Sequence, residues 1–204
     1  MKLDKKKAEK TLRRDDFTCR FCGFRAQQYQ RIVPYEDAGD PAFATACGFC
    51  ELCLTLDRTG LANSGVLVWL PEIEQAELHH IMRAIYLARA GTGDMATAAT
   101  RALDSLMARR VEAKKRLGSD DPLLLATVMH ESLTDEEYTQ SARKLDGIRL
   151  LPLDKHLVRT HTGNTNQFPQ MLKFWQSPAG PYAKFPLEKW ADIFKTANAT
   201  AGHA

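Results

Sequence analysis

The chain has 204 residues, of which 44% are hydrophobic and 26% are charged, and its net charge is +3. This composition is that of a soluble globular protein with one large domain or two small ones. The longest apolar runs, such as residues 65–70, are too short to cross a bilayer, and residues 1–7 lack the apolar core of a signal peptide. We therefore expect a cytoplasmic protein, in which clustered cysteines bind metal rather than form disulfides.

The first third of the chain predicts one helix and three short strands. Residues 3–14 are expected to form the helix, and seven of the first fourteen residues are Lys or Arg. Such a basic run is either a solvated helix face or a contact surface for phosphate or an acidic partner. Strands are expected over 26–34, 43–46 and 65–70, with a turn at 37–41.

The rest of the chain predicts mostly helix. Helices are expected to begin at Pro71, Asp94, Asp120 and Thr134, the last of them ending at Gly147. The first has an apolar stripe of Leu78, Ile81, Met82, Ile85 and Ala88, and the second one of Met95, Ala98, Ala102 and Leu106. Residues 148–153 are expected to be extended, residues 160–167 to form a polar loop, and Pro186 to open a final helix.

The predicted fold class is therefore α+β. Residues 1–70 would form a small metal-centred unit with a short sheet, and residues 71–204 a helical part packed on it within one compact domain.

All five cysteines lie in two clusters, and the spacing of these clusters suits a tetrahedral zinc ion. Cys19 and Cys22 form one Cys-x-x-Cys pair, while Cys47, Cys50 and Cys53 offer two more sulfurs. We favour Zn²⁺ held by Cys19, Cys22, Cys47 and Cys50, with Cys53 as an alternative ligand. Four thiolates fill the coordination sphere, so this zinc would be structural rather than catalytic.

Residues 14–23, Arg-Asp-Asp-Phe-Thr-Cys-Arg-Phe-Cys-Gly, resemble the opening of an HNH endonuclease. That resemblance implies a ββα hairpin carrying an Asp-His-Ile-x-Pro-like motif, whose histidine activates water. Residues 30–34 correspond to this motif in the sequence. Gln30 replaces the acidic residue of the motif, and Arg31 replaces its histidine. After the second cysteine pair, where the family tends to have histidine, Glu51 follows Cys50. A guanidinium stays protonated and cannot deprotonate water, so we expect no catalytic residues and no enzyme activity.

An intact nuclease site would need histidines from the helical part. We expect His79, His80 and His130 to be surface or helix-flank residues. His156 and His161 flank the polar loop, and they are the two that would approach such a site.

Four blocks of sequence, at residues 14–30, 47–53, 70–78 and 148–152, are similar to the IcmJ family, also called DotN. The segment from His156 to Pro186 does not obviously match that family. The resemblance implies a non-enzymatic, HNH-like subunit of the type IVB (Dot/Icm) secretion system. It further implies binding to the C-terminal tail of the coupling ATPase DotL and other coupling-complex subunits at the cytoplasmic face of the inner membrane, where effectors are recruited for export.

A helical or extended tail would dock in an apolar groove. The aromatic residues Phe174, Trp175, Trp190 and Phe194 are one candidate wall, and the strand at 66–70 is another. Both sets are equally suited to filling a core. The alternative functions are a metal-dependent HNH-type endonuclease with displaced catalytic residues, or a non-catalytic nucleic-acid-binding zinc protein that uses the basic run.

Overall fold

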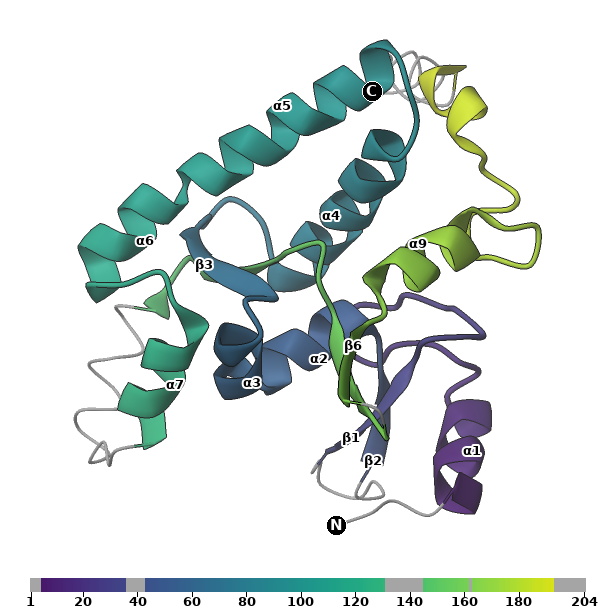
Figure 1. Ribbon diagram of the computed structural model, residues 1–204, viewed down its shortest axis with the longest axis horizontal. Coiled ribbons are helices and arrows are strands. Elements are labelled where there is room, and N and C mark those ends of the chain that lie inside the picture. Colours follow the sequence, from purple (N-terminus) through teal and green to yellow (C-terminus); the bar gives the residue numbers. More distant parts are fainter. Residues whose placement is uncertain (1–4, 36–42, 131–144, 162, 193–204) are drawn as a thin grey trace, which may run out of the picture.

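The computed structural model describes residues 5–35, 43–130, 145–161 and 163–192 (Figure 1). Its helices are α1 (Lys5–Arg14), α2 (Gly48–Leu54), α3 (Leu56–Leu61), α4 (Gln75–Arg89), α5 (Asp94–Ala108), α6 (Arg110–Leu117), α7 (Pro122–His130), α9 (Phe168–Gln176) and the 3₁₀ turn η1 (Leu187–Lys189). Its strands are β1 (Arg31–Pro34), β2 (Phe43–Ala46), β3 (Gly65–Trp69), β4 (Ile148–Pro152), β5 (Leu157–Thr160) and β6 (Gly163–Asn166).

The strands form three separate antiparallel pairs. β1 pairs with β2 so that Ile32 lies opposite Thr45, and β5 pairs with β6 as a hairpin. β3 pairs with β4, which follows it by some eighty residues, and Leu67 lies opposite Leu150. Short antiparallel pairs among several helices confirm the predicted α+β class.

Helix α1 is fixed to the β1–β2 hairpin by its last turn. Arg14 Nη2 donates to the carbonyl of Phe43 (2.9 Å), and the Asp15 carboxylate accepts from the backbone N–H of Thr45 (2.8 Å). The strand expected over 26–34 is only half correct, because strand begins at Arg31. Tyr29 adopts a positive φ of 62°, which interrupts an extended chain.

The helical part differs from the prediction at its helix ends. Helix α4 begins at Gln75 rather than Pro71, because Glu74 caps it and forms a capping box with Glu77. The helix from Asp94 breaks at Arg109 into α5 and α6, and Gly118 ends α6 in the left-handed conformation. Ile81, Ala98 and Ala102 are exposed rather than part of the predicted stripes.

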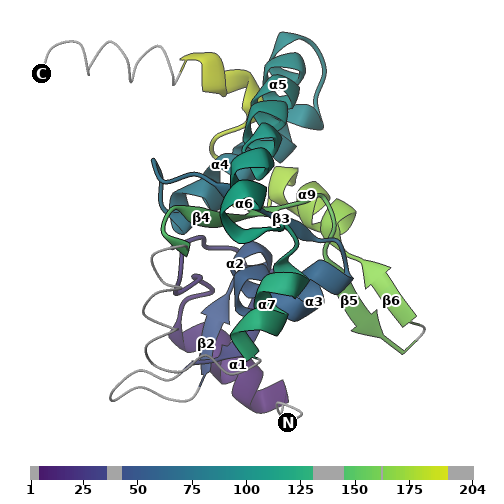
Figure 2. The same ribbon diagram turned by 90° about the vertical axis from the view of Figure 1, so that its left-hand side faces the viewer.

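The segment after β4 also differs from the prediction. The expected polar loop at 160–167 is largely the β5–β6 hairpin, and the helix α9 that follows it was not predicted. Figure 2 shows this hairpin projecting away from the body of the molecule. A short helical turn does follow Pro186. Residues 134–144 of the helix expected from Thr134, and the residue Phe194, lie outside the described residues. Gly147, the expected end of that helix, adopts a positive φ of 73° just before β4.

Two clusters of buried hydrophobic residues join the metal-binding part to the helices. Phe49 of α2 packs edge-on against Trp175 of α9 (ring centroids 5.8 Å apart), and Phe24 contacts Trp175 at the same distance. Phe174 and Trp175 are buried, and so are Leu67, Val68 and Leu70 of the β3 region. The two candidate docking walls are therefore largely core.

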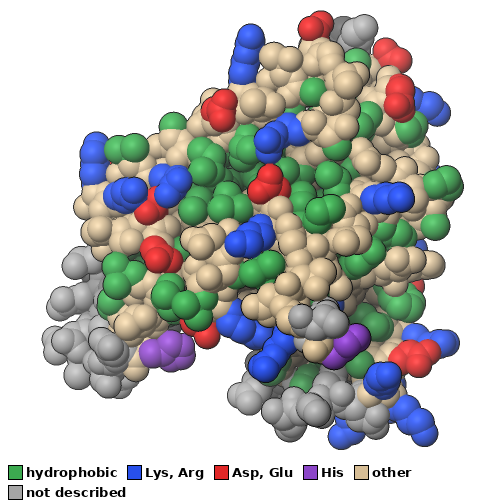
Figure 3. All heavy atoms as spheres, in the orientation of Figure 1, with side chains coloured by type: hydrophobic (Ala, Val, Ile, Leu, Met, Phe, Trp, Pro, Cys, Tyr) green, Lys and Arg blue, Asp and Glu red, His purple; other side chains and the backbone are tan. Residues whose placement is uncertain are grey.

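The large apolar side chains that remain exposed are concentrated near α3 and α7. Five of them lie on α2, α3 and α7: Leu54, Leu61, Leu124, Val128 and Met129. In Figure 3, hydrophobic side chains are visible over the region of α3 and α7, and a larger group lies in the middle of this face, below α5. Within the described part of the chain, no helix is both long enough and apolar enough to cross a membrane.

Candidate metal centre

The first cysteine pair lies in a tight turn that follows α1. Gly23 adopts φ +71° and donates its N–H to the carbonyl of Cys19 (2.9 Å), while the N–H of Cys19 donates to the carbonyl of Phe24 (2.9 Å). The side-chain amide of Gln30 donates to the carbonyls of Phe17 (2.8 Å) and Phe24 (2.9 Å). These bonds close the turn, so the sulfurs of Cys19 and Cys22 can point to one side.

The second cluster lies at the start of α2. Cys47 is the N-cap of this helix, and its sulfur accepts the backbone N–H of Cys50 at 3.5 Å. The sulfurs of Cys19, Cys22, Cys47 and Cys50 all lie within 4.8 Å of one another. They are thus close enough to hold a metal ion, and thiolates at such separations are typical of a tetrahedral zinc site.

Burial and the closeness of the four thiols oppose the ionisation of all of them together. Hydrogen bonding to Cys19 lowers the pKa of Cys22, whereas burial raises the pKa of Cys47 and hydrogen bonding to Cys19 raises that of Cys50. Each thiolate in this cluster therefore makes the ionisation of its neighbours less favourable. A divalent cation removes that conflict, so the donor set fits the zinc ion that the sequence predicts.

Cys53 stands apart from the group of four. Burial raises its pKa to about 12, and the neighbouring charges of Cys22 and Cys19 act in the same direction. Its sulfur lies 3.7 Å from Nε2 of His79. Cys53 therefore lies beside the four sulfurs rather than among them, although the choice of Cys47 over Cys53 as ligand remains a prediction.

Helix α4 lies against the sulfurs, and sequence reasoning missed its part in the site. His79 was expected at the surface, but it is fully buried and places Nδ1 3.2 Å from the sulfur of Cys50. Arg83 is also fully buried, and its Nη2 donates to the sulfur of Cys47 at 2.8 Å. His80 is exposed, as predicted, and its ring donates to the carbonyl of Cys22 (2.7 Å).

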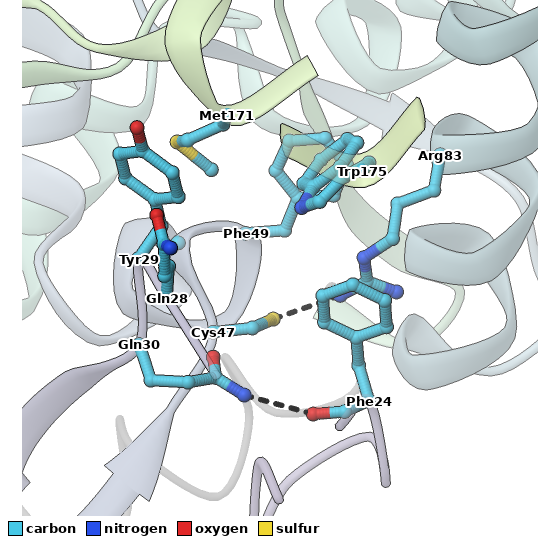
Figure 4. Close-up of a pocket in the computed structure, with 10 residues that line it drawn as sticks. Phe24, Gln28, Tyr29, Gln30, Cys47, Phe49, Arg83, Met171 and Trp175 are labelled. Atoms are coloured by element: carbon cyan, nitrogen blue, oxygen red, sulfur yellow. Dashed lines mark hydrogen bonds between the residues drawn. The ribbon is translucent and has the colours of Figure 1, made fainter. Parts of the chain in front are cut away.

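Figure 4 shows Arg83 lying over the ring of Phe24, with its guanidinium directed at Cys47. The guanidinium carbon is 3.9 Å from the centroid of that ring. These groups line one side of a cavity, with Tyr29 and Trp175 among its other walls. Arg83 Nε has no hydrogen-bond partner among the described residues.

A second polar cluster surrounds Arg31 on β1. The Glu51 carboxylate lies 3.3 Å from Arg31 Nε and 3.4 Å from Nε2 of His156, and Arg31 Nη2 also donates to Gln167 Oε1. Burial alone would raise the pKa of Glu51, but the hydrogen bond from His156 and the charge of Arg31 lower it. Of the two histidines that flank the predicted polar loop, His156 is buried beside this cluster, whereas His161 is exposed, as is His130 on α7.

Fold and site together define a class: a small mixed α/β protein built around a four-cysteine centre next to an arginine–carboxylate cluster. No protein-family model matches the chain. The type 4 apparatus protein DotN of Legionella pneumophila is 33% identical over 153 residues, which cover 71% of this chain and 71% of the relative. The chain belongs to the DotN family, also called IcmJ, as its sequence blocks predicted.

Proposed function

We propose that this protein is a non-enzymatic subunit of a type IVB secretion apparatus. The observation that carries the proposal is its 33% identity with a type 4 apparatus protein. Within that apparatus, we propose that it binds the C-terminal tail of a DotL-like coupling ATPase and helps to recruit effectors for export. It would work at the cytoplasmic face of the inner membrane, held there by the complex.

We further propose that Zn²⁺ is bound by Cys19, Cys22, Cys47 and Cys50 and that its role is structural. Four thiolates supply all the ligands that a tetrahedral zinc ion takes, so this donor set leaves no position for a reactive water. Bound zinc would cross-link the turn after α1 to the start of α2, which contributes folding free energy.

The surroundings of Arg31 support a role without catalysis. A hydrolytic site at this place would need a base that is free to accept a proton. Arg31 is a permanent cation, and it is engaged by Glu51 and Gln167. The carboxylate of Glu51 is in turn engaged by both Arg31 and His156. These groups hold β1, α2 and the start of α9 together.

The direct experiment is co-purification of the full chain with the C-terminal segment of the cognate coupling ATPase. We expect a stoichiometric complex by size-exclusion chromatography and light scattering. Replacing the exposed Leu61 and Val128 by Ser should weaken it at least tenfold, because they are the most exposed large apolar side chains of α3 and α7. The matched control is Val111→Ser, an exposed apolar residue on α6. A tail that elutes separately from the wild-type protein would contradict the proposal.

One observation favours a second candidate function, a metal-dependent nuclease. His156 and Glu51 place an imidazole and a carboxylate 3.4 Å apart beside β1. Incubating the protein with plasmid and Mg²⁺ or Mn²⁺ tests this, and we expect no nicking. Reproducible nicking that is lost in His156→Ala but kept in His161→Ala would establish the nuclease in place of the adaptor.

A nucleic-acid-binding role has weaker support. At the end of this run, Arg13 pairs with Glu9 (2.7 Å) and Arg14 pairs with Asp15 (2.7 Å), so part of its charge is neutralised within the protein. DNA binding that weakens steeply with added salt would nevertheless support that role.

A further inference from the structure

Three polar residues occupy one face of α4 at four-residue intervals: Gln75, His79 and Arg83. This spacing places their side chains in a row on one side of a helix. The row faces the sulfur cluster, and both His79 and Arg83 are fully buried. Burying such groups is costly unless each is hydrogen-bonded, so their partners explain why they are there.

The amide of Gln75 determines which nitrogen of His79 carries the proton. Gln75 Oε1 accepts the backbone N–H of Leu150 (2.8 Å), which identifies the other end of the amide as nitrogen. That nitrogen donates to the carbonyl of Leu150 (2.8 Å) and lies 2.9 Å from Nε2 of His79. Because an amide nitrogen only donates, Nε2 of His79 is the acceptor. In the neutral ring the proton is then on Nδ1, and it points at the sulfur of Cys50.

Arg83 supplies a permanent positive charge to the other side of the cluster. Its Nη2 lies 2.8 Å from the sulfur of Cys47 and 3.5 Å from that of Cys22. Four thiolates around a divalent cation carry a net charge of −2, so one buried guanidinium halves it. The guanidinium is held in place by the ring of Phe24, at 3.9 Å.

We propose that Gln75, His79 and Arg83 are positioning residues for the metal centre: from one helix they orient and partly neutralise the thiolates of Cys22, Cys47 and Cys50. The strength of metal binding then depends on α4 as well as on the two cysteine clusters. This inference rests on the proposed zinc site. Groups that hydrogen-bond metal ligands commonly change affinity by about 10- to 100-fold.

The experiment uses the full chain, loaded with zinc or with Co²⁺, whose thiolate charge-transfer bands report the electron density on sulfur. His79→Phe removes the N–H donor and keeps a ring, whereas His79→Asn places an amide nitrogen near the position of Nδ1. Arg83→Met removes the charge, and Arg83→Lys retains it. Chelator competition measures the zinc dissociation constant of each variant. His130→Phe and Arg101→Met, exposed residues on other helices, are the controls.

We expect zinc binding to weaken about 10- to 100-fold in His79→Phe and Arg83→Met, with recovery in His79→Asn and Arg83→Lys. The charge-transfer bands of His79→Phe should move to lower energy, because a sulfur without a hydrogen bond gives up its electrons more easily. If the buried variants do not fold, Gln75→Met is the test, since Gln75 is only half-buried and acts through His79. It should shift the bands in the same direction.

Wild-type affinity and an unchanged spectrum in the folded variants, or in Gln75→Met, would overturn the inference. A His79→Asn variant that behaves like His79→Phe would overturn it as well. Failure of the wild-type protein to bind one equivalent of zinc would instead contradict the proposed metal centre itself, so the two failures are distinguishable.

Discussion

Replacing one cysteine at a time distinguishes the possible ligand sets of the metal centre. The sulfur of Cys47 lies within the group of four, whereas that of Cys53 is not among them. We expect Cys47→Ser to lose stoichiometric zinc and Cys53→Ser to retain it, because a tetrahedral zinc ion needs all four of its sulfur ligands and Cys53 lies outside the group of four. Metal content after dialysis against a weak chelator measures both. The reverse pattern, with zinc lost from Cys53→Ser and retained in Cys47→Ser, would show that Cys53 takes the place of Cys47 in the ligand set.

The histidines show what the sequence could and could not predict about the site. The two cysteine clusters were recognisable, because their spacing is a local property of the chain. His79 was not, because a polar residue on an amphipathic helix is usually exposed, and only the packing of α4 against the sulfurs buries it. His156 reaches Glu51 through the turn before the β5–β6 hairpin, and no local pattern encodes that contact.

At the scale of elements, α3 and α7 approach so closely that Gly60 has no room for a side chain. A Cβ at this position would lie 2.5 Å from the backbone nitrogen of Leu123 at the start of α7. Although Ala favours helix over Gly, we expect Gly60→Ala to lower the free energy of unfolding by about 1–3 kcal/mol, because the helices must separate. Urea unfolding measures this loss. Gly91→Ala is the control, because a Cβ at Gly91 would lie 3.3 Å from its nearest neighbour, the carbonyl oxygen of Ala88. This variant should change the free energy of unfolding little.

The connection between α6 and α7 depends on the ionised carboxylate of Asp120. Burial alone would raise the pKa of Asp120, but the hydrogen bond from Arg110 and the charge of Lys114 lower it. A lowered folded pKa adds stability above the unfolded pKa of about 3.9, and this is lost as the pH falls through the folded value. Asp120→Asn should therefore cost about 1–3 kcal/mol at pH 7 and progressively less below about pH 4.

Urea unfolding of Asp120→Asn and the wild-type protein, compared at the same pH, measures that difference. Asp104→Asn, at an exposed position of α5, is the control. If the free energies of unfolding of Asp120→Asn and wild type differ by the same amount from pH 7 to pH 3.5, the ionised carboxylate does not stabilise this connection.

Several elements followed from local sequence, and others did not. The cysteine spacing, the β-branched run of β3 and the basic α1 were sufficient to place these elements. The β5–β6 hairpin was missed because Gly and Asn make up three of the four residues of β6, and both are depleted in strands. No Gly or Pro in the sequence marks the break between α5 and α6. The break occurs where the carbonyl of Arg109 accepts the N–H of Trp69 on β3, which is a tertiary contact.

At the scale of the whole molecule, the division at residue 70 does not separate two cores. β3 belongs to the first half and pairs with β4 from the second, and one hydrophobic cluster contains both Cys19 and Trp175. The outer partners of the sulfurs come from α4, beyond that division. We therefore propose that the chain folds as one unit in which metal and helices depend on each other.

Such a unit should lose all of its structure in one step. We expect the urea midpoints for far-UV circular dichroism, tryptophan fluorescence and zinc release to coincide, because Trp175 packs on Phe24 beside the first cysteine pair and α4 holds the sulfurs from outside. Zinc release at clearly lower urea than loss of helix would instead mean that residues 1–70 open by themselves. In that case, the contacts of His79 and Arg83 would be too weak to couple the two halves.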